Sequence, residues 1–183
     1  MERYGGGAIL IQDYDPRWPA MFADERAHIA AALGSALVAV EHVGSTAVPG
    51  LAAKPIIDIQ ISVKRLHPIQ TYASGLAQLD YVHAPHADDG FCPFFHRPVA
   101  WPHTHHVHVV EAGGDEERRT LAFRDYLREH SDAACEYEDL KRRLAPQYSA
   151  TDLSSRQRYA DAKTEFITGV IERAFAAGYP RER

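Results

Sequence analysis

At 183 residues, the chain is long enough for one domain with a sizeable hydrophobic core. Hydrophobic residues make up 45% of it, as in ordinary globular proteins, and a net charge of -5 argues against general nucleic-acid binding. No apolar run reaches the length of a membrane span or a signal peptide, and Cys92 and Cys135 have neither a CxxC spacing nor a secreted disulfide pattern. We therefore expect a cytoplasmic protein without a membrane role.

The first part of the chain predicts a helix followed by two strands. After a short apolar run at residues 8–12, a turn and a helix are expected to end near Gly34, with Pro19 in the first helical turn. The Val-rich segment "ALVAVEHVG" predicts a strand that stops at Gly44. The segment "KPIIDIQISV", residues 54–63, predicts a second strand, because isoleucines alternate with Asp58, Gln60 and Ser62.

The middle and the end of the chain differ in pattern. Residues 67–80 favour a helix, "YVHA" and "FCPFFHRP" favour short strands around an Asp-Asp-Gly turn, and "HHVHVVE" favours a further strand. From Asp115 onward the apolar residues recur at helical spacing, in residues 116–130, 132–145 and 155–177. We expect a single α+β domain over residues 1–183: a mixed β-sheet core over 1–112, with helices on one side, and C-terminal helices over 113–178.

The turn after the first strand is a candidate phosphate site. Gly44 lets backbone N–H groups approach a ligand, and Ser45 could add a hydroxyl at the start of the following turn. Asp58 on the next strand could hold a divalent cation over phosphates seated there. The structural alternatives are that Ser45 and Thr46 cap a helix, and that Asp58 and Gln60 face solvent.

Four histidines in the segment "WPHTHHVHVVE" form a second candidate cluster. His106 and His108 share one face of the predicted strand, and His105 lies on the other. Because imidazole suits zinc, nickel, copper or iron better than magnesium, Asp58 with His106 and His108 would favour a transition metal. The alternative is a structural role for these histidines.

Two cations on the C-terminal helices are candidate phosphate partners. Arg124, Lys141 and Lys163 are spaced so that some of them could line one cleft. Arg124 and Lys141 are the candidates to neutralise negative charge there, whereas most of the other helical charges are expected to be solvated.

The segments "YDPRWP", "EHVGSTAVPGLAAKPIIDI", "THHVHVVE", "LAFRDYLREH", "YEDLKRRLA" and "YADAKTEFI" together resemble the GrpB family, in order from about Tyr14 to about Phe175. The resemblance implies a nucleotidyltransferase-like fold, the α/β core shared with DNA polymerase beta. In that superfamily, a Gly-Ser turn and three acidic residues serve magnesium and a nucleoside triphosphate. Here Gly44 and Ser45 match the turn and Asp58 the first acid, while Gln60 and His108 fall at the second and third.

Three hypotheses follow for function. The first is a metal-dependent nucleotidyltransferase-like protein that binds a nucleotide or another phosphorylated small molecule, with Asp58 and His108 catalytic and a divalent metal (Mg, or a transition metal such as Zn, Ni or Mn) as cofactor. The second is a degenerate relative that serves as a binding or folding-assistance module, because two of the three carboxylates are replaced. The third is hydrolysis by a metal-bound hydroxide at an Asp/His site.

Overall fold

The computed structural model describes residues 7–181, and a five-stranded mixed sheet lies at its centre. The strand order is β1-β2-β5-β4-β3, with β2 and β5 parallel and the other neighbours antiparallel. The strands are β1 (Leu37–Val43), β2 (Ile57–Val63), β3 (Val82–His83), β4 (Phe94–Arg97) and β5 (His105–Glu111). The mixed sheet confirms the predicted α+β fold.

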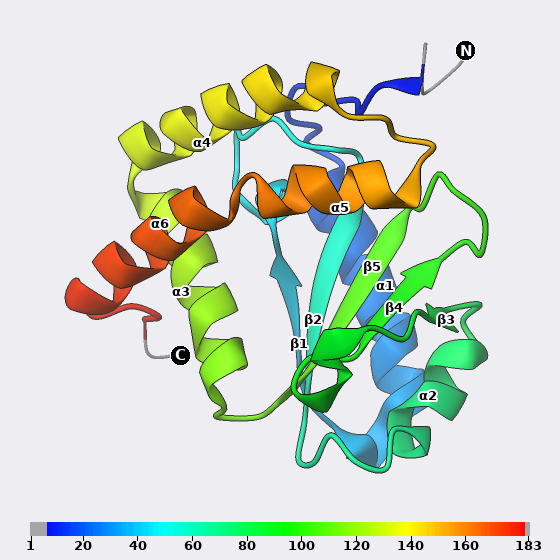
Figure 1. Cartoon of the computed structure of the whole chain (residues 1–183). Helices are drawn as coiled ribbons and strands as arrows, with labels where there is room; N and C mark the ends of the chain where they lie inside the picture. The colour runs from blue at the N-terminus through cyan, green and yellow to red at the C-terminus, as the bar shows by residue number, and fades with distance from the viewer. Residues whose placement is uncertain (1–6, 182–183) are drawn as a thin grey trace.

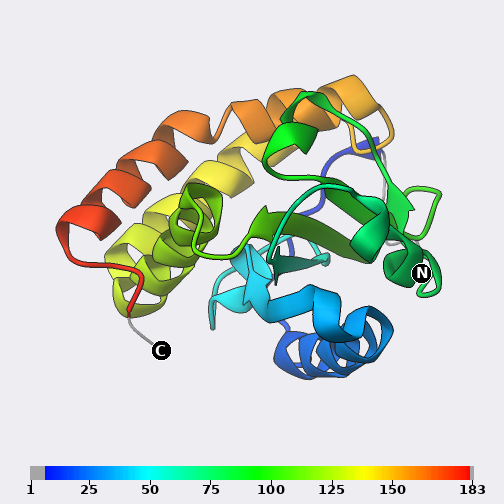
Figure 2. The same cartoon turned by 90° about the horizontal axis from the view of Figure 1, so that it is seen from below.

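The sheet separates two groups of helices, so that the molecule has three layers (Figure 1, Figure 2). Helices α1 (Trp18–Leu33) and α2 (Gln70–Ala77) lie against one face. The other side carries the C-terminal segment, with α3 (Asp115–Glu129), α4 (Ser131–Leu144), α5 (Leu153–Asp161) and α6 (Thr164–Ala176). Four short 3₁₀ turns connect these elements: η2 (Gly34–Ala36), η3 (Ser45–Ala47), η4 (Ala87–Gly90) and η5 (Ala145–Gln147).

The alternating pattern of β2 decides what each face of the sheet presents. Ile57, Ile59 and Ile61 are fully buried in the main core together with α1 and α2. The residues between them belong to the opposite face, and the register sets Asp58 beside His106 and Gln60 beside His108 on β5. Polar residues of two central strands therefore meet beneath the C-terminal helices.

Two predicted elements differ from the structure. The second strand begins at Ile57 and not at Lys54, because Pro55 has no N–H for the ladder and the chain bends there. The helix expected over residues 155–177 is divided between α5 and α6 by a turn at Ala162 and Lys163, where the N–H of Lys163 bonds the carbonyl of Ala160. Both breaks bring a lysine to the same side of the sheet.

A second hydrophobic cluster attaches the C-terminal helices to the loop after β1. Phe123 and Leu127 of α3, Tyr137 of α4 and Val170 of α6 pack with Val48, among others. Within residues 7–181, no helix is both long enough and apolar enough to cross a membrane.

Candidate functional site

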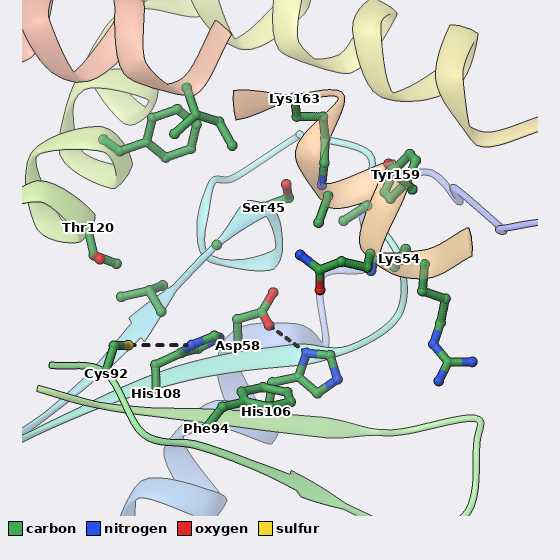
Figure 3. Close-up of a pocket in the computed structure, with 18 of the residues that line it drawn as sticks. Ser45, Lys54, Asp58, Cys92, Phe94, His106, His108, Thr120, Tyr159 and Lys163 are labelled. Atoms are coloured by element: carbon green, nitrogen blue, oxygen red, sulfur yellow. Dashed lines mark hydrogen bonds and ion pairs between the residues drawn. The ribbon is translucent and has the colours of Figure 1, made fainter. Parts of the chain in front are cut away.

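A cavity of about 780 Å³ lies between the polar face of the sheet and the C-terminal helices (Figure 3). Its floor is made by the turn after β1 and by side chains of β2 and β5, and its roof by α3, α4, α5 and α6. In Figure 3, Lys54, Lys163 and Tyr159 lie on one side of Asp58, while Cys92 and Thr120 lie on the other. The volume is in the range of sites for small organic ligands.

The Gly-Ser turn packs directly against Asp58. Gly44 has φ +67°, and a Cβ placed on it would lie 2.6 Å from Oδ2 of Asp58, closer than any real contact of this kind. The turn is fixed from below, because Nε2 of His42 lies 2.9 Å from the hydroxyl of Thr46 and the imidazole stacks on Phe22. Glycine at this position is therefore what permits the backbone to approach the carboxylate.

Asp58, His106 and His103 form a continuous hydrogen-bonded row. Oδ1 of Asp58 lies 3.2 Å from Nδ1 of His106, and Nε2 of His106 lies 3.0 Å from Nδ1 of His103. Burial alone would raise the pKa of Asp58, but the hydrogen bond with His106 and nearby positive charge hold this pKa at about 2. Burial lowers the pKa of His106, and lowers that of His103 to about 3, so both rings are neutral at pH 7.

The ionised carboxylate fixes the tautomers of this row. Nδ1–H of His106 donates to Asp58, so Nε2 of His106 must accept a hydrogen bond, and Nδ1–H of His103 supplies it. Both nitrogens of His106 are thereby engaged with protein groups.

His108 and Gln60 occupy the positions beyond this row. Nδ1 of His108 lies 4.0 Å from Sγ of Cys92, and burial lowers the pKa of His108 to about 4 and raises that of the Cys92 thiol to about 12. The amide of Gln60 is completely buried, and neither of its polar atoms has a hydrogen-bond partner in the described part of the chain. Gln60 lies outside the set of described residues that line the cavity, so the position next to Asp58 supplies no charge there.

Lysine is concentrated in this cavity. The chain contains four lysines, and three of them, Lys54, Lys141 and Lys163, line the cavity. In residues 7–181, none of the three forms an ion pair with a carboxylate. Burial lowers the pKa of Lys54, and it lowers the pKa of both Lys141 and Lys163 to about 7.

Aromatic rings and one carbonyl hold these ammonium groups in place. The ring of Tyr159 has Nζ of Lys163 at 4.3 Å and Nζ of Lys54 at 5.5 Å from its centroid. Lys141 donates to the carbonyl of Ala52 and lies 4.7 Å from the ring of Tyr137. These contacts orient the lysines without neutralising them.

The structure brings most of the sequence-predicted residues together. Gly44, Ser45, Asp58, His106, His108 and Lys141 all line the one cavity. His105 lies on the opposite face, as predicted, where its Nδ1 is 3.2 Å from the guanidinium of Arg97.

Arg124 does not reach this site. Its guanidinium donates to Oε2 of Glu41 and to Oδ1 of Asp125, both at 2.7 Å, and to the carbonyl of His42. Two carboxylates neutralise Arg124, and its pair with Glu41 joins α3 to β1. Arg124 lies outside the described lining of the cavity.

Lys54, Arg156 and Tyr159 were missed by the sequence reasoning, although a signal for each was present. Lys163 was considered for the cleft but was not chosen as a phosphate partner. Lys54 is four residues from Asp58 in the predicted strand, so the two would lie on the same face. Arg156, Tyr159 and Lys163 recur at the spacing of one helical face, i, i+3 and i+7. The guanidinium of Arg156 lies 4.3 Å from the ring of Trp101 at the same end of the cavity.

The donor set fits a metal ion poorly. Among residues 7–181, no group of three or more His, Cys, Asp or Glu side chains is arranged to hold one. One oxygen of Asp58 and both nitrogens of His106 already take part in hydrogen bonds. The metal site expected from Asp58, His106 and His108 stays a prediction that these contacts do not favour.

Fold and site define an α+β protein with a lysine-rich cavity between a mixed sheet and C-terminal helices. The chain belongs to the GrpB family, whose model, described as "GrpB protein", matches residues 8–173. It is 39% identical over 170 residues to a UPF0157 protein of Halalkalibacterium halodurans, covering 92% of this chain and 84% of that protein.

A solved structure and a longer relative extend the comparison. The crystal structure of conserved protein GrpB from Enterococcus faecalis superposes with a TM-score of 0.78 at 31% identity, over 92% of this chain and 98% of that one. A dephospho-CoA kinase of Mycobacterium leprae is 29% identical over 188 residues, which cover 88% of this chain but only 45% of the kinase.

Proposed function

We propose that the cavity binds a small phosphorylated molecule. The observation that carries this proposal is the convergence of three of the four lysines on one cavity without a carboxylate partner. Lys141 is buried and the other two are half-buried. Ammonium groups withdrawn from water without a carboxylate destabilise a folded protein, and an anionic ligand with several oxygen acceptors offsets that cost. Phosphate groups supply such acceptors at high charge density.

The remaining lining suits an organic group attached to the phosphates. Phe94, Trp101 and Phe123 supply apolar and aromatic surface around the polar floor. A volume of about 780 Å³ leaves room for a nucleotide. The resemblance to nucleotidyltransferases also favours a nucleotide, since the Gly44–Ser45 turn lies beside Asp58 as the superfamily pattern requires.

Binding is better supported than transfer of a nucleotidyl group. Transfer through metal ions needs several carboxylates around the phosphates. Here Asp58 is the only acidic side chain of the three expected positions, and a neutral, buried amide follows it. The same shortage of metal ligands disfavours hydrolysis by a metal-bound hydroxide.

Calorimetric titration with ATP, GTP, CTP and UTP tests the proposal. We expect at least one of them to bind the wild-type protein, and Lys163→Met to weaken that binding about tenfold or more, the effect of one lost charge-assisted contact. Lys64→Met is the matched control, because Lys64 is the one lysine outside the cavity and is exposed. No binding of any of the four nucleotides, or equal losses in the two variants, would contradict it.

Pyrophosphate release separates binding from transfer. Incubation of the bound nucleotide with candidate hydroxyl and amine acceptors should release no pyrophosphate above the rate of the Asp58→Asn variant. Release that depends on Asp58 would restore the transferase hypothesis.

A further inference from the structure

We propose that lysine ammonium groups take the place of a divalent cation in this site, so that the phosphorylated ligand binds without a metal ion. The inference rests on the proposed function and concerns how the same cavity neutralises the phosphates. Three observations carry it: the state of the acidic side chain, the supply of positive charge, and the balance between them.

Three carboxylates line the cavity, those of Asp58, Asp88 and Glu116, but Asp58 alone stands at one of the three strand positions expected to be acidic. Oδ1 of Asp58 accepts a hydrogen bond from His106, and the ring of His106 is in turn held by His103. The strand position that would carry a second acid holds Gln60, whose amide is buried away from the cavity. A magnesium ion prefers several oxygen ligands, and the three expected strand positions offer it a single charged one, Asp58.

Positive charge comes instead from three different elements of the fold. Lys54 belongs to the bend before β2, Lys141 to α4, and Lys163 to the turn between α5 and α6. Lys54 and Lys163 meet on the ring of Tyr159, and Figure 3 shows both on the same side of Asp58. The fold therefore brings lysines from distant segments of the sequence to one aromatic ring inside the cavity.

The balance of charge equals that of a divalent cation. The three cavity lysines, once protonated, and the two arginines of the lining, Arg119 and Arg156, carry five formal positive charges, and the three carboxylates of the lining carry three negative charges. With the histidines counted as neutral, the lining therefore has a formal net charge of about +2. The groups that face Lys141 and Lys163 are Glu138, Arg142, Lys54 and Asp58, and of these Glu138 is itself paired with Arg142.

The direction in which Asp58→Asn changes nucleotide affinity distinguishes neutralisation by lysine from neutralisation by a metal ion. If a metal bridged Asp58 and the phosphates, Asp58→Asn would abolish nucleotide binding. If the ammonium groups act alone, the same variant removes a negative charge that repels the phosphates, and affinity should stay the same or rise by about threefold to tenfold. The amide retains the size of the side chain, so the fold is preserved, which the thermal unfolding midpoint would verify.

The experiment is calorimetric titration of ATP and of inorganic tripolyphosphate, just below neutral pH, in EDTA and again in excess magnesium. For each probe, we expect the affinity in EDTA and the affinity in excess magnesium to agree within about threefold. Lys54→Met should lose about tenfold or more in affinity under both conditions, and Asp58→Asn should lose none. Lys54→Gln, which keeps a polar group, provides the same test should the methionine variant fold poorly.

Two results would overturn the inference, and they differ in what else they remove. Binding that requires magnesium and disappears in Asp58→Asn would refute the lysine substitution while leaving the phosphate site intact. Binding of neither probe, with or without magnesium, would refute both this inference and the proposed function.

Discussion

Replacement of Gly44 by alanine probes the contact between the Gly-Ser turn and Asp58. The Gly44 backbone has φ 67° and ψ -171°, a conformation in which a side chain costs about 1–3 kcal/mol. The added Cβ would also lie 2.6 Å from Oδ2 and 2.9 Å from Cβ of Asp58, so that the carboxylate must move. We expect the free energy of unfolding to fall by about 3 kcal/mol or more, since strain and displacement add.

Gly50→Ala is the matched control for this substitution. Gly50 also has positive φ, +80°, but nothing lies within 4 Å of a Cβ placed there. The control should therefore lose only the strain of the left-handed backbone, about 1–2 kcal/mol. Urea denaturation of both variants measures the difference. Equal losses in the free energy of unfolding would show that the close contact between Gly44 and Asp58 adds nothing to the cost of the substitution.

Three further predictions concern charge and protonation. The pKa values of Lys141 and Lys163 are about 7 in the free cavity, and a bound polyphosphate would raise them. ATP binding at about pH 8 should therefore take up protons, and affinity should fall as pH rises above about 7. Titrations in buffers of different ionisation enthalpy measure this uptake. Arg124→Met should destabilise the fold by about 2 kcal/mol in urea, because it removes the hydrogen bonds of a buried guanidinium to two partly buried carboxylates, yet leave ATP affinity unchanged. Nitrogen NMR should find His106 neutral at pH 7 with its proton on Nδ1, and Asp58→Asn should disturb that tautomer; a charged ring would contradict the hydrogen-bonded row.

The faces of the two central strands could be predicted from sequence, because a period of two leaves little choice. The isoleucines of β2 must be buried, so Asp58 belongs to the other face, and the same reasoning separates His105 from His106 and His108. The parallel register that sets Asp58 beside His106 depends on pairing across 48 residues, which no local pattern specifies.

The cations of the site could not be selected in the same way. Helical spacing shows that Arg124 and Lys141 are each near apolar neighbours, but not which carboxylates lie opposite them. Arg124 meets Glu41 and Asp125, whereas Lys141 meets a carbonyl and a ring. Lys163 was named for the cleft but not chosen, because its segment predicts one unbroken helix, whereas in the structure it lies in the turn between α5 and α6.

The distribution of lysine has a practical consequence for chemical labelling. An amine with a pKa of about 7 is about half deprotonated at that pH, and it reacts with acylating reagents more readily than an ordinary surface amine, whose pKa is about 10.4. In this chain the lysines with lowered pKa are those of the cavity, and Lys64 is the remaining one. Dyes or surfaces coupled through lysine at neutral pH would therefore modify the cavity first, and protection by an added nucleotide would reveal its occupancy without any knowledge of the reaction.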